Sequence, residues 1–486
     1  MNYSSTRNSS LKVSSAEAIL TGLAPDGGLF VPASFPKLDF EALAGKPYSE
    51  IAFNILRLFL TDYDEGFLRN AVTEVYGERF DGKAGHLEAL SDDLYALELW
   101  HGPTCAFKDY ALQLMPLLLV EARRMLGEQD ETIILVATSG DTGSAALAGY
   151  SNVNSVKIAV FYPNNGTSLL QQLQMTTQTG KNVAVYGVTG NFDDAQRGVK
   201  RAFTDPALAE KLAARGAKLS SANSINWGRL VPQIVYYATS YLALCQKGRI
   251  KYGQPLDFCV PTGNFGDIMA GWYAKQMGLP VGKLICASNK NNVLAEFLET
   301  GQYNANREFY KTSSPSMDIL VSSNLERLLC HASGSTEKVT GWMAELARDG
   351  SYQVDATVLE AIQATFEAGW CSEEAVFDEI RQAKQSYGYL SDPHTAVALR
   401  VAAEKGKGAD GRPVVVLSTA SPYKFSCQVL EALKQPVPDD EFDALRALEA
   451  FSGVKAPESL SKLVDKPVRF TEVIDPASIS EISLKM

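Results

Sequence analysis

The stretch TIILVATSGDTGSAA (residues 132–146) decides the fold of this chain. Residues 132–137 are a short, apolar, β-branched run that is typical of a buried strand. The turn TSGDTG follows, and an alanine-rich stretch that favours a helix begins near Ser144. A strand, a turn and a helix in this order form the first half of a βαβ unit.

The same order of elements recurs along the chain. Apolar, β-branched runs that predict strands are found at 156–163, 182–188, 256–263, 283–289 and 414–420, and helical patterns follow them. This alternation predicts an α/β fold with mainly parallel, twisted sheets and flanking helices. Residues 1–98 and 435–486 lack the alternation, so we expect separate regions there, and the glycine-rich stretch 404–412 is predicted to be a surface loop.

Composition limits the classes of protein to which the chain can belong. A length of 486 residues allows two or three domains, and the net charge of −11 argues against nucleic acid or an anionic membrane as partner. No apolar run reaches the roughly 18 residues of a membrane span, and no secretory signal is visible at the start. Seven scattered cysteines favour reduced thiols and a cytoplasmic protein, and four unclustered histidines favour no metal site.

Three turns that follow predicted strands carry polar residues. In parallel α/β sheets, ligands bind at such turns, beyond the carboxyl ends of the strands. The first turn, SGDTG, brings Ser139, Asp141 and Thr142 to the start of a helix, which suits either an anion or simple helix capping. The second, VPTGNFGDIMAG (260–271), has glycines at 263 and 266 that let backbone amides approach a phosphate closely.

The third turn, LSTASPYKF (417–425), ends a predicted strand with two hydroxyl groups. Ser418 and Thr419 could cap the next helix or bind a ligand at the edge of the sheet. Ser421 and Pro422 are themselves typical of a helix start, Ser421 as the N-cap residue. Capping therefore stays open beside ligand binding.

Lys108, in WHGPTCAFKDY (100–110), indicates that these turns bind one common ligand. Taken alone it is a surface lysine in a first helical turn. Partial burial beside a helix start would lower its pKa and favour attack on an aldehyde, which forms a Schiff base. A reactive amine, a phosphate-binding turn and a hydroxyl at a strand end are together what pyridoxal 5'-phosphate requires.

Longer motifs make the chain resemble a known family. ELWHGPTCAFKD (98–109), TSGDTG (138–143), SINWGRLVPQIVYY (224–237), PTGNFGD (261–267) and DPHTAVA (392–398) are similar to motifs of threonine synthases of the longer bacterial and fungal type. The resemblance runs from about residue 4 to beyond residue 425, and STRNSS with GLAPDGGLFVP (22–32) looks like the N-terminal domain of that family. Trp100 and Ala398 depart from its usual residues, which are a smaller aromatic and a glycine.

The resemblance implies a fold and a division into domains. The fold is that of fold type II enzymes dependent on pyridoxal phosphate, related to the β subunit of tryptophan synthase, with an additional N-terminal domain. We expect that domain at 1–98, the catalytic core at 99–434 with an inner subdomain at about 110–225, and a C-terminal segment at 435–486 that packs on the core or on the N-terminal domain.

The resemblance also implies a reaction. It is the conversion of O-phospho-L-homoserine and water to L-threonine and phosphate, a γ-elimination followed by a β-addition. Lys108 would hold the cofactor as a Schiff base and move protons at the substrate carbons. The other implied site residues are Gly263, Asn264, Phe265 and Asp267 for the cofactor phosphate, Thr419 for the ring nitrogen, and Ser139, Asp141, Thr142 and Arg327 for the substrate.

Other interpretations stay open at this point. Asn226 and Trp227 either line the site or pack beside it, and His101 is either catalytic or a support for its loop. A serine/threonine dehydratase or a phospholyase would use the same fold and cofactor. A binding protein without cofactor, or a nucleotide-binding enzyme, would leave Lys108 without a role. The sequence does not indicate an oligomeric state.

Overall fold

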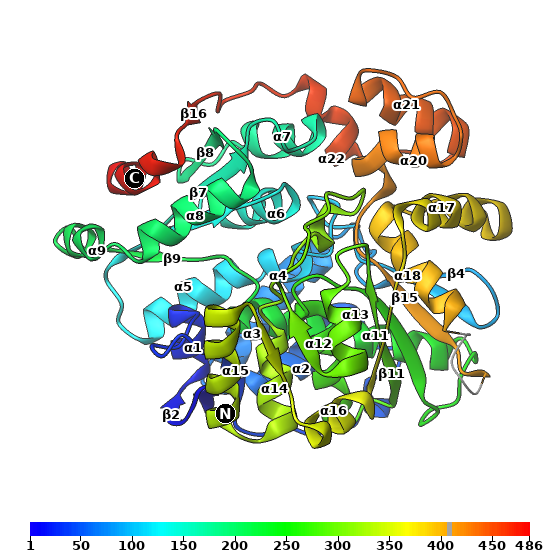
Figure 1. Cartoon of the computed structure of the whole chain (residues 1–486), viewed down its shortest axis with the longest axis horizontal. Helices are drawn as coiled ribbons and strands as arrows, with labels where there is room; N and C mark the ends of the chain where they lie inside the picture. Colours follow the sequence, from blue (N-terminus) through cyan, green and yellow to red (C-terminus); the bar gives the residue numbers. More distant parts are fainter. Residues whose placement is uncertain (406–410) are drawn as a thin grey trace.

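The computed structural model describes residues 1–405 and 411–486. It has a large lobe built around a six-stranded sheet and a small lobe built around a five-stranded sheet (Figure 1). The large sheet has the strand order β14-β11-β10-β15-β5-β4. Its strands are β4 (His86–Ala89), β5 (Leu94–Glu98), β10 (Leu256–Pro261), β11 (Val281–Ser288), β14 (Phe366–Trp370) and β15 (Val414–Ser418). All its neighbouring pairs are parallel except β4 and β5.

The small sheet has the order β16-β8-β7-β6-β9 and is parallel throughout. Its strands are β6 (Glu131–Ala137), β7 (Val156–Pro163), β8 (Val183–Val188), β9 (Ala217–Ser220) and β16 (Val473–Ile474). It is flanked by α6 (Asp141–Tyr150), α7 (Leu169–Thr176), α8 (Phe192–Phe203) and α9 (Pro206–Ala213). The predicted mainly parallel α/β fold is confirmed.

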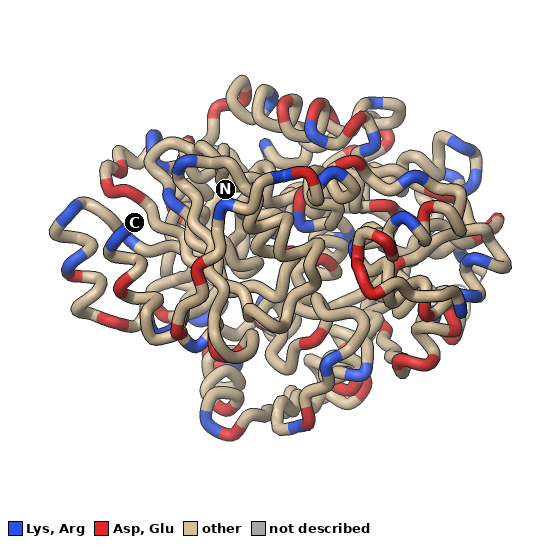
Figure 2. The backbone as a smooth tube through the Cα atoms, turned by 90° about the horizontal axis from the view of Figure 1, so that it is seen from above, with Lys and Arg blue, Asp and Glu red and all other residues tan. Residues whose placement is uncertain are grey.

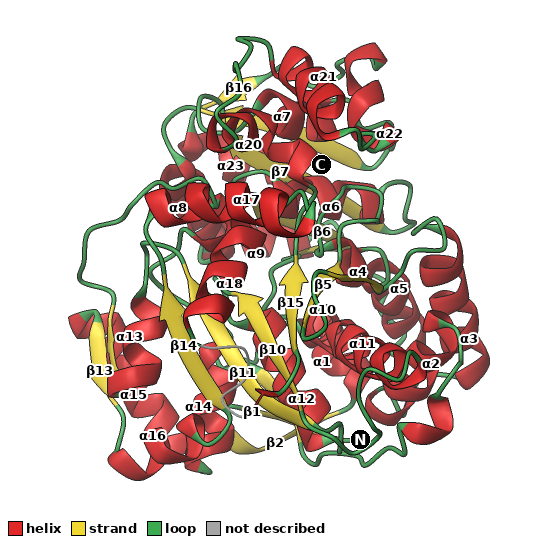
Figure 3. Ribbon diagram, turned by 90° about the vertical axis from the view of Figure 1, so that its right-hand side faces the viewer, coloured by secondary structure: helices red, strands yellow, loops and turns green. Residues whose placement is uncertain are grey.

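Most of the remaining helices surround the large sheet. They are α4 (Asp109–Leu112), α5 (Met115–Met125), α10 (Trp227–Leu230), α11 (Ile234–Gln246), α12 (Gly266–Gln276), α13 (Val293–Thr300), α14 (Leu325–Ser333), α15 (Thr336–Asp349), α16 (Ala356–Gln363), α17 (Glu373–Tyr387) and α18 (Pro393–Glu404). Two short strands, β12 (Gln302–Asn304) and β13 (Ser351–Gln353), pair beside α13 and α15. In Figure 3 the parallel strands of the large sheet point toward the small lobe, so their carboxyl ends face it.

The first part of the chain contributes to both a small domain and the large sheet. An antiparallel sheet of β1 (Tyr3–Ser5), β2 (Asn8–Val13) and β3 (Phe30–Pro32) comes first, followed by α2 (Tyr48–Phe59) and α3 (Glu65–Thr73); α1 (Ser15–Thr21) lies between β2 and β3. Strands β4 and β5 then join the large sheet, with β5 parallel to β15. The large sheet therefore includes residues before 98. Strands β4 and β5 belong to it because β5 is hydrogen-bonded to β15, a strand far along the chain.

The C-terminal segment covers the small lobe. After α20 (Ser426–Ala432), α21 (Glu441–Ser452) and α22 (Glu458–Ser461), the chain adds β16 to the edge of β8 and packs α23 (Ile479–Lys485) against α8. Helix α7 ends at Thr176, four residues before the predicted glycine end. Most of the predicted loop 404–412 lies outside the described residues.

The distribution of charged residues and the lengths of the apolar helices agree with what the composition predicts. Figure 2 shows Lys and Arg interspersed with Asp and Glu over the outside of both lobes. None of the helices in 1–405 and 411–486 is long and apolar enough to cross a membrane. All seven cysteines are free thiols.

Candidate active site

Lys108 is held at the carboxyl edge of the large sheet by the strand end of β15. The Phe107 amide donates to the Thr419 carbonyl over 2.8 Å, and Ala106 forms an isolated antiparallel bridge with Ala420. Residues 106–107 thus run across the carboxyl end of β15. Backbone hydrogen bonds therefore fix the position of the lysine.

The HGPT-x-x-FKD motif is a turn closed on itself by Asp109. The Asp109 carboxylate accepts hydrogen bonds from the Thr104 backbone amide and the Thr104 hydroxyl, each over 2.8 Å. A Cβ on Gly102 would lie 2.6 Å from the Asp109 Cβ, so the glycine is needed for this close approach. Burial raises the pKa of Asp109 to about 6, against the hydrogen bonds from Thr104. The motif is therefore the frame that presents Lys108.

The Lys108 amine lies in a nearly enclosed polar position. Its side chain is 12% exposed, and Nζ lies 3.2 Å from Ser316 Oγ and 3.7 Å from Asp141 Oδ2. Burial lowers the pKa of Lys108; Asp141 opposes this effect, and the positive charges of Lys424 and Arg229 add to it. Helix α4 has only four residues, so burial and neighbouring charges, more than a helix dipole, set the pKa.

Asp141, from the small-lobe turn, lies between two lysines. Its Oδ1 accepts from Lys424 Nζ over 2.7 Å and from Gln171 Nε2 over 2.9 Å. Its Oδ2 accepts from Ser316 Oγ over 3.2 Å and faces Lys108. Burial alone would raise the pKa of Asp141, but Lys424 and Lys108 outweigh it and hold that pKa well below the ordinary range. Asp141 is therefore an anion in the folded protein.

The glycine turn at the end of β10 has the features of an anion site. Phe265 adopts a left-handed conformation (φ 63°, ψ 5°) at the N-cap of α12, which turns successive backbone amides toward one side. A Cβ on Gly263 would lie 2.8 Å from the Ser316 carbonyl, and one on Gly266 would lie 3.2 Å from Asn324 Nδ2. That amide nitrogen is buried and has no hydrogen-bond partner among the described residues. A free donor beside a glycine turn fits a phosphate group.

Asp267 supports this turn from within the core. Tyr236 and Tyr237 both donate to its Oδ1, while Oδ2 is buried without a partner in the described part of the chain. Burial raises the pKa of Asp267 to about 6, and the two tyrosine hydrogen bonds oppose that rise. The side chain thus ties the start of α12 to α11.

The two hydroxyls at the end of β15 differ in their partners. Ser418 Oγ accepts from Trp100 Nε1 over 3.1 Å, from Tyr389 over 3.0 Å and from Thr395 over 3.1 Å. The unusual Trp100 is therefore part of the support of this strand end. Protein groups already surround Ser418, which leaves Thr419 as the hydroxyl for a ligand.

In the small-lobe turn (residues 138–143), two backbone amides already have a hydrogen-bond acceptor, whereas two hydroxyl groups are accessible. Ser139 and Thr142 are both partly exposed. The Thr138 hydroxyl accepts from the amides of Gly140 and Gly143, each over 3.0 Å. The side chains at 139 and 142 are therefore the groups of this turn that a ligand can reach.

Arg327 lies behind the glycine turn, away from Lys108. Its guanidinium donates to the Phe30 carbonyl over 3.0 Å, to Asn324 Oδ1, and to the Ile225 carbonyl over 2.5 Å. The side chain is fully buried, and burial lowers its pKa to about 10. These contacts orient the Asn324 amide so that its nitrogen faces the turn. A direct contact of Arg327 with the substrate stays a prediction.

The residues with open roles take part in packing. Asn226 caps α10 and donates to the Ile19 carbonyl over 2.9 Å, while Trp227 is fully buried. His101 Nε2 is bonded to Glu98 over 2.7 Å. These contacts favour a supporting role for all three.

Sequence reasoning missed Lys424, Ser316, Asn324 and His394. His394 Nδ1 is bonded to Asp392 over 2.7 Å, and its Nε2 accepts from the Ser316 amide over 3.2 Å. Lys424 lies in SPYKF, whose pattern predicts only a helix start, and the structure confirms Ser421 as the N-cap of a 3₁₀ turn. A buried lysine that pairs with a distant turn leaves no local signal in a sequence.

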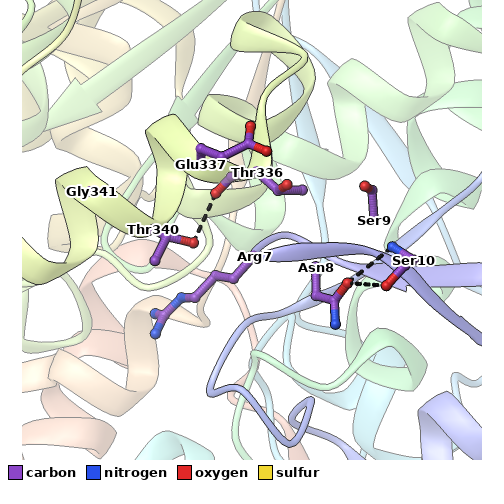
Figure 4. Close-up of a pocket in the computed structure, with 8 residues that line it drawn as sticks. All are labelled: Arg7, Asn8, Ser9, Ser10, Thr336, Glu337, Thr340 and Gly341. Atoms are coloured by element: carbon purple, nitrogen blue, oxygen red, sulfur yellow. Dashed lines mark hydrogen bonds between the residues drawn. The ribbon is translucent and has the colours of Figure 1, made fainter.

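A separate surface hollow of about 600 Å³ lies between β2 and the start of α15 (Figure 4). Arg7 at its edge is already paired with Glu326 over 2.9 Å. No group of three or more His, Cys, Asp or Glu in the described residues is placed to hold a metal ion.

Comparison with known proteins first defines the class. The family model "Pyridoxal-phosphate dependent enzyme" matches residues 83–420, which places the chain among the enzymes that depend on this cofactor. The models "Threonine synthase N terminus" and "Threonine synthase, C-terminal" match residues 2–76 and 395–482.

The relatives then define the family. Threonine synthase of Schizosaccharomyces pombe is 38% identical over 468 residues, 89% of each chain, and that of Pseudomonas aeruginosa is 39% identical. The crystal structure of a PLP-bound threonine synthase from Brucella melitensis has a TM-score of 0.89 and 37% identity, covering 100% of this chain and 99% of its own. The chain belongs to the threonine synthase family.

A second group of relatives is longer than this chain. "Threonine synthase-like 1" of Homo sapiens is 42% identical over 434 residues, which is 86% of this chain and 58% of the relative. The chain thus spans less than two thirds of these proteins.

Proposed function

We propose that the chain is a threonine synthase that converts O-phospho-L-homoserine and water to L-threonine and phosphate with pyridoxal 5'-phosphate as cofactor. One observation carries the proposal: the buried Lys108 amine, with its lowered pKa, lies at the carboxyl edge that also carries the glycine turn, and it faces Asp141 of the small-lobe turn. The enzyme would be a carbon–oxygen lyase that eliminates phosphate.

The residues present fit the cofactor. Lys108 would hold it covalently through the amine, as a Schiff base, and residues 263–265 with Asp267 would form the phosphate-binding turn, with the unpaired Asn324 amide as a further donor. Thr419 would meet the ring nitrogen. When bound, the cofactor supplies an electron sink for charge that develops on the substrate carbons.

The protein itself would move protons and hold the substrate. Lys108 Nζ is the base and acid for the α- and β-carbons, and its lowered pKa favours the unprotonated amine that accepts a proton. The Ser139 and Thr142 hydroxyls would bind the substrate carboxylate or phosphate. Asp141 would contribute through Ser316 and Lys108, because Lys424 and Gln171 occupy its other oxygen.

The proposal includes the organisation and location of the enzyme. The division we propose is 1–98, 99–434 and 435–486, with the inner subdomain at about 110–225; β4 and β5, at the end of the first region, join the large sheet of the second. The free thiols suit a reducing compartment, which favours the cytoplasm. The partner we assign is the small-molecule substrate.

Product analysis tests the function. Purified protein, with and without added cofactor, would be incubated with O-phospho-L-homoserine, and phosphate, threonine and 2-oxobutyrate would be measured. We expect phosphate and threonine in equal amounts, with cofactor required. Phosphate with 2-oxobutyrate in place of threonine would instead identify a phospholyase. In separate incubations, 2-oxobutyrate from L-threonine or pyruvate from L-serine would identify a dehydratase. Lys218→Met, which removes a surface ion pair with Glu128, serves as the control variant.

A further inference from the structure

Lys424 is a fully buried lysine that the reaction described above does not use. Its side chain is 0% exposed, and Nζ has two protein acceptors: Asp141 Oδ1 at 2.7 Å and the Thr104 carbonyl at 3.0 Å. Thr104 belongs to the turn that presents Lys108, and Asp141 belongs to the small lobe. Lys424 therefore connects the frame of the reactive lysine with the carboxylate that faces it.

The two oxygens of Asp141 have separate tasks. Oδ1 is held by Lys424 and by Gln171 at 2.9 Å, while Oδ2 reaches Lys108 at 3.7 Å and Ser316 at 3.2 Å. A buried carboxylate with one cationic neighbour would keep a proton on that neighbour. Here the carboxylate is already neutralised by a second ammonium: Lys424 Nζ lies at 2.7 Å, closer than Lys108 Nζ at 3.7 Å.

We propose that Lys424 is a positioning residue for Lys108: it is the permanent counter-ion of Asp141 and thereby lets the Lys108 amine release its proton. The proposal rests on the proposed role of Lys108 as the reactive amine. The proton leaves Lys108 Nζ for water, and the contact of 2.7 Å between Lys424 Nζ and Asp141 Oδ1 is kept.

Other charged groups near Lys108 do not replace Lys424 in this role. Arg229 adds positive charge but donates to the Ala222 carbonyl, and burial lowers its pKa to about 10. Asp267 is held by two tyrosines. His394 accepts from the Ser316 amide through Nε2. Of the described side chains, Lys424 is the one whose ammonium contacts the Asp141 carboxylate most closely.

The protonation of Lys108 can be measured without catalysis. The full chain, freed of cofactor, would be labelled with trace acetic anhydride at a series of pH values, and acetylation of Lys108 would be followed by peptide mapping. In wild type we expect a midpoint below that of ordinary lysines. In Lys424→Met we expect the midpoint to rise by roughly one pH unit or more, because the repelling charge is lost and Asp141 turns to Lys108. Lys218→Met should leave it unchanged.

A double variant separates the charge effect from packing. Lys424→Met with Asp141→Asn removes both buried charges, so we expect a Lys108 midpoint close to that of wild type and a fold that tolerates the change better than the single variant. Lys424→Arg keeps the positive charge and should also keep the midpoint. In the cofactor-loaded enzyme the Lys108 amine is free only after substrate has bound, so the acid limb of the kcat profile should move to higher pH in Lys424→Met, whereas a purely structural defect would lower activity at every pH.

Each result has a defined meaning. A wild-type midpoint at or above that of ordinary lysines overturns the proposal, even if Lys424→Met does not fold. So does an unchanged midpoint in Lys424→Met, or an equal rise in the single and the double variant. A shifted midpoint in a protein that makes no threonine supports the inference and rejects the proposed function.

Discussion

The two turns that build the site from opposite lobes are stabilised by different means. The large-lobe turn, 262–266, carries no charged side chain, and a free amide donor from Asn324 lies beside it. The small-lobe turn, 138–143, contains a buried carboxylate that is bonded to Lys424 and faces Lys108. One turn is built from backbone and neutral groups, and the other from charges.

This difference assigns a role to each turn. A neutral turn with spare donors suits an anionic group that brings its own charge. The small-lobe turn differs: its carboxylate is negative and already paired with a lysine, so that group does not bind an anionic ligand. It can instead control the protonation of the lysine opposite, while its partly exposed hydroxyls contact a ligand.

Replacing the lysine at this edge of the large sheet should have the largest effect. In Lys108→Ala we expect threonine formation to fall by at least about a thousandfold, because the amine that moves protons is lost. Thermal unfolding should change little, since the frame of the turn depends on Thr104 and Asp109. Retention of more than about a tenth of the activity would mean that neither turn faces the reacting group.

Asp141→Asn tests the charged turn. It leaves Lys424 buried without its counter-ion, so we expect a loss of about 3–5 kcal/mol in the free energy of unfolding, measured in urea. Asn324→Leu is the matched change beside the neutral turn. It removes a donor without a partner and the Oδ1 acceptor of Arg327, whose other two hydrogen bonds remain, so we expect a smaller loss of about 1–3 kcal/mol. Equal losses in the two variants would remove the distinction between the turns.

Wild type and Asp141→Asn should also differ in their stability in acid. Because the pKa of Asp141 is lower in the folded than in the unfolded chain, its contribution to stability is full above its unfolded pKa, about 4, and is lost as the pH falls below that value. The wild-type stability curve should therefore drop more steeply below about pH 4 than that of Asp141→Asn. Parallel curves would show that Asp141 is not stabilised as an anion.

Alanine substitutions at Gly140 and Gly266 compare how strongly the backbone of each turn depends on glycine. Gly140 has φ 143°, and its Cβ would lie 2.5 Å from Gln171 Cδ, so we expect Gly140→Ala to cost about 2–3 kcal/mol of stability. Gly266 has an ordinary φ and meets only the Asn324 amide, at 3.2 Å, so Gly266→Ala should cost less than about 1 kcal/mol. Urea unfolding of both variants, compared with Gly248→Ala at an open positive-φ position, measures the difference.

The smallest effect is expected at the end of β15. Thr419→Val preserves shape and removes one hydroxyl, so we expect cofactor affinity to fall about fivefold, near 1 kcal/mol, with little change in unfolding. Equilibrium dialysis of the cofactor checks this. If Ser418→Ala weakens binding more than Thr419→Val does, the wrong hydroxyl of the strand end has been assigned.

Local pattern predicted much of the fold and part of the site. The strands at 131–137 and 156–163 follow from runs of β-branched residues, and the glycine turn follows from its spacing. The position of β5 beside β15 could not be predicted, because parallel pairing joins distant segments. Lys424 was missed for the same reason, since only the folded chain brings it to Asp141.

Strand β16 has a consequence for how the protein is made. The amide of Gly187 donates to the Glu472 carbonyl and that of Thr189 to Ile474, so residues synthesised long after β8 complete the edge of the small sheet. While the chain is still on the ribosome, that edge remains open to pairing with other extended chains. During translation, β8 is therefore exposed to unwanted strand pairing until the C-terminal segment has been made.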